Sequence, residues 1–351
     1  MGGPYPMVLR QADIDAAVAA GVIESEAAER LIAFAQSAHA VSTQPDDENF
    51  RLITGFNDIF VTIGLVLFWG ALRFVLADAG PVVSSAVIAA TSWVLAEVLT
   101  RTKHLALPSI VLLVIYAVAT FNALTAIIVG SGTTDLESFL INGGFKLAAA
   151  GLITAGLVGL HWLRFRVPIT VAAGCAALAV MVVTLVAMIA PQLIIQHPGS
   201  IFLPIGLVVF ALAMWFDMSD RMRVTRRTDI AFWLHLLAAP LIVHPIVAAI
   251  TSQSSGLAHG DAELIIAVFF VIGLVALVID RRALLASSLI YLGYAAYTLI
   301  SDTALASTSH AVTPLVIGCI VLLLSIAWRP LRSFVMAAVP CSIRMRMPSA
   351  E

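Results

Sequence analysis

The sequence predicts an all-α, polytopic helical membrane protein with about ten transmembrane helices. Of its 351 residues, 61% are hydrophobic and 11% are charged, whereas a soluble domain has about half apolar and about a quarter charged residues. Several apolar runs, among them 105–129 and 167–190, reach the about 20 residues that a helix needs to cross a bilayer. Backbone groups in hydrocarbon need internal partners, and the alternating strands of a barrel are not seen, so we expect helical spans.

Residues 1–41 predict a small cytoplasmic helical hairpin ahead of the first span. Apolar residues recur at helical spacing on both sides of Gly21, a natural helix stop, and Ser25 suits the N-cap of the second helix. Because about 40 residues is too few to bury an independent core, we expect the hairpin to pack on the membrane domain or on a partner. No secretory signal is apparent, and residues 42–56 are predicted to be a linker.

Residues 57–328 are predicted to form the transmembrane helical domain. The weakest separations between its spans are the turn at 77–81 and the break at 280–282, so nine or eight spans are alternatives to ten. The predicted spans are Asn57 to Ala77, Pro81 to Leu99, Leu105 to Val129, Phe139 to Leu160, Val167 to Ala190, Ile201 to Phe216, Ile230 to Ile250, Leu264 to Ile279, Ala283 to Ser301 and Ala311 to Trp328.

Positive charge is confined to every second loop, and this pattern predicts the orientation. Lys and Arg occur at 101–103, 164–166, 221–227 and 281–282 and again after the last span, and the loops between have neither. The positive-inside rule places the basic loops in the cytoplasm, which puts both termini there. Residues 329–351 are predicted to be a basic cytoplasmic tail that either lies along anionic lipid or is solvated.

Residues 14–31, with the sequence IDAAVAAGVIESEAAERL, resemble the cytoplasmic helix pair that opens a group of predicted bacterial multi-pass inner-membrane proteins of unknown function. The resemblance covers about the first 35 residues and the many-span layout. It implies a cell inner (plasma) membrane location and brings no substrate, cofactor or catalytic residue.

Ionisable residues inside spans are the first candidates for a substrate or ion site, because burying them in a bilayer is costly. Asp58 suits a cap at a helix start, and Glu97 suits an interfacial ion pair with Arg101. Alternatively, the two carboxylates lie at the same depth and together bind a cation or share a proton. Lys146 is expected about 10 Å inside its span, as an anion contact or as a counter-ion.

Polar residues of the seventh and ninth spans form a second group of candidates. Tyr291 and Tyr294 belong to a stripe of hydroxyls at helical spacing, which we expect to face inward, as hydrogen-bonded packing or as a cavity lining. His235 and His244 lie on opposite sides of one helix and cannot share a metal. We expect them to bond carbonyls freed by a proline kink, and we expect no metal site and no cofactor.

The first and sixth spans are similar in sequence, since residues 59–68 match residues 201–210 at seven of ten positions. The two spans would run in opposite directions, as in inverted-repeat transporters, whose sites lie at helices interrupted by Gly or Pro. Gly64 in one span, and Pro204 with Gly206 in the other, would supply the interruptions.

The leading functional hypothesis is a gradient-driven transporter of a small molecule or ion, with a cavity near Gly64, Gly206, Lys146 and the hydroxyl stripe. The alternative is a membrane scaffold or sensor that recruits a cytoplasmic partner through the hairpin. The chain lacks the nucleotide-binding glycine loop and the motifs of metalloproteases and serine hydrolases, so we do not expect an enzyme. The lipid bilayer is the predicted partner, and nucleic acid is not expected, because topology explains the arginines.

Overall fold

The computed structural model describes residues 14, 17–42, 56–130, 136–220, 223, 225–251, 259–301, 303 and 306–340. All regular structure in these residues is helical, and ten helices in them are long and apolar enough to cross a membrane. The predicted fold class is therefore confirmed. The breaks at 77–81 and 280–282 both separate helices, which favours ten spans over the alternatives of eight or nine.

The described residues before residue 50 belong to a unit separate from the rest of the chain. Within it, residues 17–19 are helical, Gly21 has a φ of 69°, and α2 runs over Ser25–Ser42. Glycine adopts this left-handed conformation without a steric cost, so Gly21 ends the first helix as predicted. The helix α2 extends one residue into the predicted linker, and residues 43–55 lie outside the described part of the chain.

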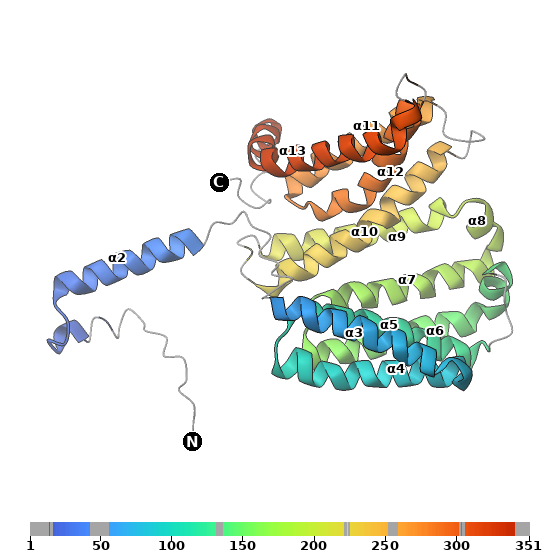
Figure 1. The fold of residues 1–351 in the computed structure, drawn as a ribbon, viewed down its shortest axis with the longest axis horizontal. Helices are drawn as coiled ribbons and strands as arrows, with labels where there is room; N and C mark the ends of the chain where they lie inside the picture. The colour runs from blue at the N-terminus through green and yellow to red at the C-terminus, as the bar shows by residue number, and fades with distance from the viewer. Residues whose placement is uncertain are drawn as a thin grey trace. The chain divides into compact units, whose positions relative to one another are not determined.

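The second unit contains the membrane-spanning helices (Figure 1). Its first half has α3 (Phe56–Val75), η1 (Ala77–Ala79), α4 (Gly80–Ala96), the π-helical turn η2 (Glu97–Thr102), α5 (Ala106–Ile128), α6 (Leu136–Phe165) and α7 (Ile169–Ile189). Its second half has α8 (Pro191–Gln196), α9 (Gly199–Ser219), α10 (Arg226–Thr251), α11 (His259–Ile279), α12 (Ala283–Ser301), η3 (Ala306–Thr308) and α13 (Ser309–Ala338).

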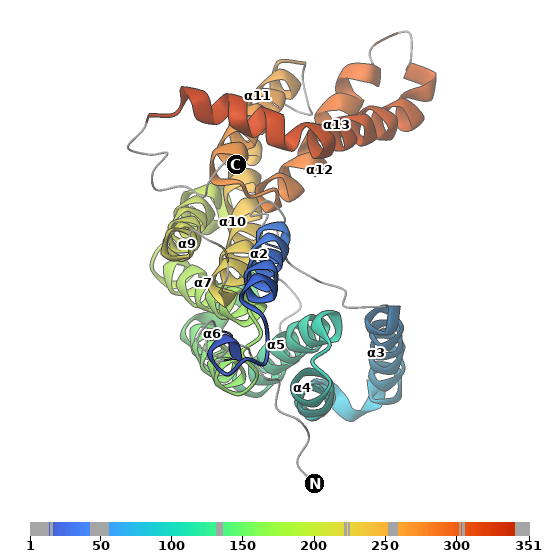
Figure 2. The same ribbon diagram turned by 90° about the vertical axis from the view of Figure 1, so that its left-hand side faces the viewer.

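Spans that follow each other in the chain pack as antiparallel neighbours, in the pairs α4 with α5, α6 with α7, α9 with α10 and α11 with α12 (Figure 1). The helix α7 also contacts α10, and α12 contacts both α10 and α13. At one edge, α3 lies beside α4 and α5 (Figure 2).

The fourth span begins later than predicted, because α6 is kinked at Gly144. This residue has φ 27° and ψ −115°, and the straight, span-length part of the helix is Gly144–Phe165. A Cβ at Gly144 would lie 3.0 Å from Cγ of Met188 on α7, so a glycine allows both the backbone turn and the close packing. Lys146 therefore lies in the first turn of this straight part of α6, two residues from its start, whereas the prediction placed it seven residues inside its span.

The helix that forms the last span continues through Ala338, ten residues beyond the predicted boundary between membrane domain and tail at 328/329. Pro330 is accommodated inside α13, and Trp328, Arg332 and Met336 are all buried. These three residues are four apart and share one face of the helix. Arg332, one of several basic residues on which the predicted cytoplasmic tail rests, is thus part of the packed face.

The two similar spans are not interrupted, contrary to the repeat hypothesis. Both α3 and α9 are continuous helices, and Pro204 lies within α9. A Cβ at Gly206 would lie 2.9 Å from atoms of Leu241 and Ile242 on α10, whereas nothing described lies within 4 Å of a Cβ at Gly64. Gly206 therefore permits close helix packing, and α10 rather than a cavity lies on the side where its Cβ would point.

Candidate functional site

The structure places Asp58 and Glu97 in different environments. Asp58 is buried in the first turn of α3, where its backbone carbonyl accepts a hydrogen bond from Thr62 Oγ1 at 2.7 Å. Glu97 accepts two hydrogen bonds from Arg164, at 2.7 and 3.0 Å, and one from Arg101 at 3.2 Å. The predicted ion pair between Glu97 and Arg101 is confirmed, and Arg164 forms a second ion pair with the same carboxylate. Both oxygens of Glu97 thus face arginines rather than a second carboxylate.

The remaining predicted candidates do not converge. Lys146 is exposed on α6. Tyr291 bonds through its hydroxyl to Nδ1 of His244, and Tyr294 on the same helix is 54% exposed. The hydroxyl stripe is therefore divided between a helix contact and an outward face, and the expectation that it faces inward holds only in part.

A network of buried charges lies at the basic-loop end of the second half, where α9, α10, the α11–α12 junction and α13 meet. At its centre, the carboxylate of Asp217 accepts hydrogen bonds from Nε and Nη2 of Arg281, the former at 3.2 Å. His235 Nε2 lies 2.8 Å from Oδ2 of the same carboxylate. Asp217 is 3% exposed, Arg281 1% and His235 0%. We call these three residues the buried triad.

A second cluster surrounds Asp280, the residue before Arg281. Its carboxylate accepts hydrogen bonds from Arg223 Nη1 at 2.7 Å and from Trp328 Nε1 at 2.8 Å, and Arg332 Nε lies 3.6 Å away. Arg223 also donates to the backbone carbonyls of Ile279 and Asp280. The cluster thus attaches the loop after α9, the α11–α12 junction and α13 to one carboxylate.

Backbone conformation marks the same cluster. Arg223 and Asp280 have φ values of 53° and 62°, in the left-handed region that costs a non-glycine residue about 1–2 kcal/mol. Each is held there by the other through the Arg223–Asp280 ion pair. Strained residues of this kind persist where the surrounding contacts determine them.

Charges buried in the triad need partners, because an unpaired buried ion costs several kcal/mol. Asp217 and Arg281 compensate each other, and Arg281 also donates to the carbonyl of Thr228 at 3.2 Å. His235 retains a buried Nδ1 without a hydrogen-bond partner in the described structure. The triad therefore has one nitrogen that can take up a proton and one carboxylate shared by two donors.

Sequence reasoning missed this network. Asp217 lies one residue beyond the predicted end of its span, and Arg223, Arg281 and Arg332 were interpreted only as markers of topology. The expectation that His235 and His244 bond freed carbonyls is wrong, because their ring nitrogens bond Asp217 and Tyr291. One signal was available, since Asp217 and Asp280 are acids at span ends on the basic side of the membrane.

No cluster of three or more His, Cys, Asp or Glu side chains suited to a metal is found among the described residues. Comparisons of the chain with protein families, with curated proteins and with solved structures find no match. The ten apolar helices nevertheless identify the chain as a multi-pass integral membrane protein in contact with the lipid bilayer.

Proposed function

We propose that the protein is a gradient-driven transporter of the bacterial inner membrane in which the buried triad binds the coupling proton. One observation carries the proposal: a carboxylate, an imidazole and a guanidinium, each at least 97% buried, meet among membrane-spanning helices. Ionisable groups in such positions are costly and mark ion or proton pathways. Of the three, only an imidazole has an ordinary pKa close to neutral pH.

The geometry defines where the proton is bound. In the neutral ring, Nε2 carries the hydrogen, because the Asp217 carboxylate can only accept. A proton taken up at Nδ1 gives an imidazolium that still donates to Asp217. The triad, in which Asp217 and Arg281 compensate each other, then gains one positive charge. The neighbouring Asp280 cannot offset that charge, because it is already paired with Arg223.

Protonation would be coupled to helix movement through Asp217. His235 lies on α10, Asp217 on α9 and Arg281 at the α11–α12 junction, so the shared carboxylate holds three helical elements together. An imidazolium at His235 competes with Arg281 for that carboxylate. Protonation would therefore strengthen the contact between Asp217 and His235 and weaken the contact between Asp217 and Arg281. The described structure encloses the triad, as expected for one closed state of an alternating-access cycle.

Proton-driven uptake into proteoliposomes tests the proposal. The full chain is reconstituted, an inward proton gradient is imposed, and accumulation of radiolabelled succinate, inorganic phosphate and leucine is measured. We expect one probe to accumulate with wild type and with H244Q, the matched control on the same helix. H235Q should exchange that probe without accumulating it. Gradient-driven accumulation by H235Q at the wild-type level, or no flux of any probe, would contradict the proposal.

A scaffold or sensor is the second candidate function, and the separate N-terminal unit favours it. Val22 and Leu31 of that unit expose apolar side chains suited to a partner. Deleting residues 1–49 distinguishes the two functions. A transporter would retain proton-driven uptake, whereas a scaffold would show no uptake with either chain and would lose a cytoplasmic partner in the deletion variant.

A further inference from the structure

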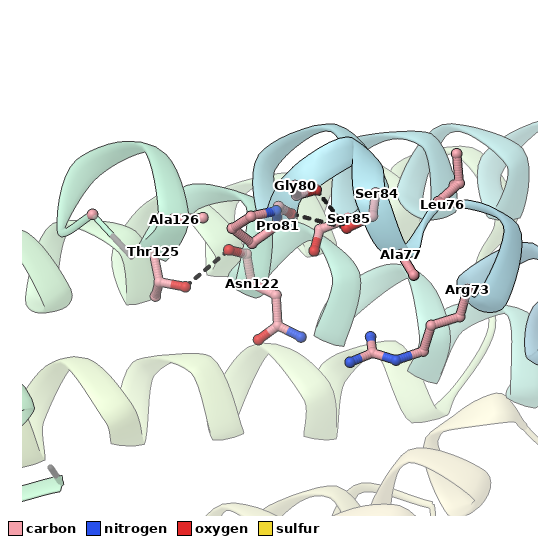
Figure 3. Close-up of a pocket in the computed structure, with 11 residues that line it drawn as sticks. Arg73, Leu76, Ala77, Gly80, Pro81, Ser84, Ser85, Asn122, Thr125 and Ala126 are labelled. Atoms are coloured by element: carbon pink, nitrogen blue, oxygen red, sulfur yellow. Dashed lines mark hydrogen bonds between the residues drawn. The ribbon is translucent and has the colours of Figure 1, made fainter. Parts of the chain in front are cut away.

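A hollow lined by both polar and apolar residues lies between α3, α4 and α5 at the end opposite the basic loops (Figure 3). Its volume is about 640 Å³, and Arg73, Ser84, Asn122 and Thr125 are among the residues that line it. A smaller hollow of about 240 Å³ shares Arg73, Ser85 and Asn122 with the first and reaches Trp69. The two hollows are adjacent and share these three lining residues, so we treat them as one recess.

Hydrogen-bond donors face this recess from three helices. Arg73 has no hydrogen bond or ion pair within the described residues, and its guanidinium points toward the side chain of Asn122 (Figure 3). Trp69, one helical turn away on α3, is 6% exposed, and its Nε1 has no partner in the described structure. Ser85 on α4 is 8% exposed and lines both hollows.

Negative charge is missing from the described lining of the recess. The acid nearest in sequence is Asp78 on η1, which is exposed and is not a lining residue. The hydroxyls of Ser84 and Thr125 donate to backbone carbonyls of their own helices, so their oxygen atoms are free to accept hydrogen bonds. Arg73, Trp69, Ser85 and Asn122 are left to donate toward a ligand.

We propose that this recess binds an oxyanion, a carboxylate or phosphate group, with Arg73 as its principal contact. A guanidinium binds such groups through two parallel N–H···O bonds, and the amide of Asn122 and the indole of Trp69 supply further donors. An unpaired arginine near a membrane surface can also simply extend its charge to water. The buried, unpaired Nε1 of Trp69 on the same helical face favours a ligand site instead.

The site is separate from the buried triad and does not depend on the proposed function. The proposed proton-coupled function gives no role to a recess with hydrogen-bond donors in the half of the molecule that lacks the triad. An oxyanion site gives the recess such a role. The oxyanion belongs either to a free solute or to a phospholipid headgroup, and both present the same chemistry to Arg73.

Iodide quenching of Trp69 fluorescence tests the site on the full chain in a neutral detergent. The Trp69 signal is the difference between each protein and the same protein with Trp69→Phe. We expect R73Q to lower the iodide quenching constant at least threefold, K146Q to leave it unchanged, and R73K to give an intermediate value. Acrylamide, an uncharged quencher, should quench all of these proteins equally, and matching apparent melting temperatures show that they are folded.

Two further measurements identify the source of the oxyanion. Protection of Trp69 from iodide by inorganic phosphate or succinate, lost in R73Q, would indicate a free solute. Native mass spectrometry showing a phospholipid retained by wild type and K146Q, but lost by R73Q, would indicate a headgroup. Equal iodide quenching in wild type and R73Q, with neither protection nor a retained lipid, would overturn the proposal.

Discussion

Adjacent arginines illustrate how strongly the environment decides the role of a residue in this protein. Arg281 is almost completely buried and donates to Asp217, whereas Arg282 is exposed with its guanidinium 5.1 Å from the centre of the Trp328 ring. The sequence treats them alike, because both belong to a basic break between spans. Only the fold turns one arginine inward to a carboxylate that is 64 residues away in the chain.

Replacing each arginine by alanine should therefore have very different effects on stability. R281A leaves Asp217 buried without its main partner, and breaking a buried ion pair costs about 3–5 kcal/mol. R282A loses a cation–π contact worth about 0.5–1 kcal/mol at an exposed site. We expect a large fall in the apparent melting temperature of the detergent-solubilised protein for R281A and a small one for R282A. Similar falls for both would contradict the paired role of Arg281.

Local reasoning succeeded at the residue scale where the partner lies on the same helix. Glu97 and Arg101 are four residues apart, so their ion pair could be predicted. The hydrogen bonds that Glu97 accepts from Arg164 and Asp217 accepts from His235 join different helices. Helical periodicity carries no information on such contacts, because it describes one helix at a time.

Most element boundaries were predicted within a few residues. The ninth predicted span, Ala283 to Ser301, coincides with α12, and the third, Leu105 to Val129, differs from α5 by one residue at each end. Hydropathy locates spans well because the thickness of the bilayer sets their length. The helices depart most from the predicted ranges at Gly144, where a kink separates two helical segments, and at the end of α13, where a packed face carries an arginine.

The extended α13 makes a prediction at the scale of the element. Met336 is 3% exposed and Phe334 is 79% exposed, although both lie beyond the predicted end of the span. M336A should lower stability by about 2–5 kcal/mol, as for other buried large-to-small changes, and F334A should have little effect. Thermal unfolding of the two variants in detergent compares them. A solvated tail would instead give two neutral variants.

At the scale of the whole molecule, the alternation of basic and non-basic loops agrees with ten helices, an even number. Each basic break also contains a non-glycine residue in the left-handed conformation, namely His104, Arg166, Arg223 or Asp280, with φ between 53° and 62°. These turns at one end of the bundle let consecutive spans reverse direction within a few residues.

The predicted orientation can be measured with single cysteines in a chain whose three native cysteines are replaced. Lys103 and Asp78 are both exposed and lie at opposite ends of the second span. We expect a membrane-impermeant maleimide to label D78C in intact cells and K103C only after permeabilisation, because the positive-inside rule places Lys103 in the cytoplasm. Labelling of K103C in intact cells would reverse the orientation.

The sequence by itself determined that this chain is helical, that it spans the membrane and where most spans lie, because the bilayer imposes the same length and polarity on every span. Only the tertiary structure decided that Asp217, His235 and Arg281 meet, that Gly206 packs closely against α10 and that a recess with hydrogen-bond donors opens beside Arg73. These features depend on which helix faces which. Since the lipid and the contacts between helices are similarly apolar, hydropathy cannot distinguish a lipid-facing side of a helix from a side that packs on another helix.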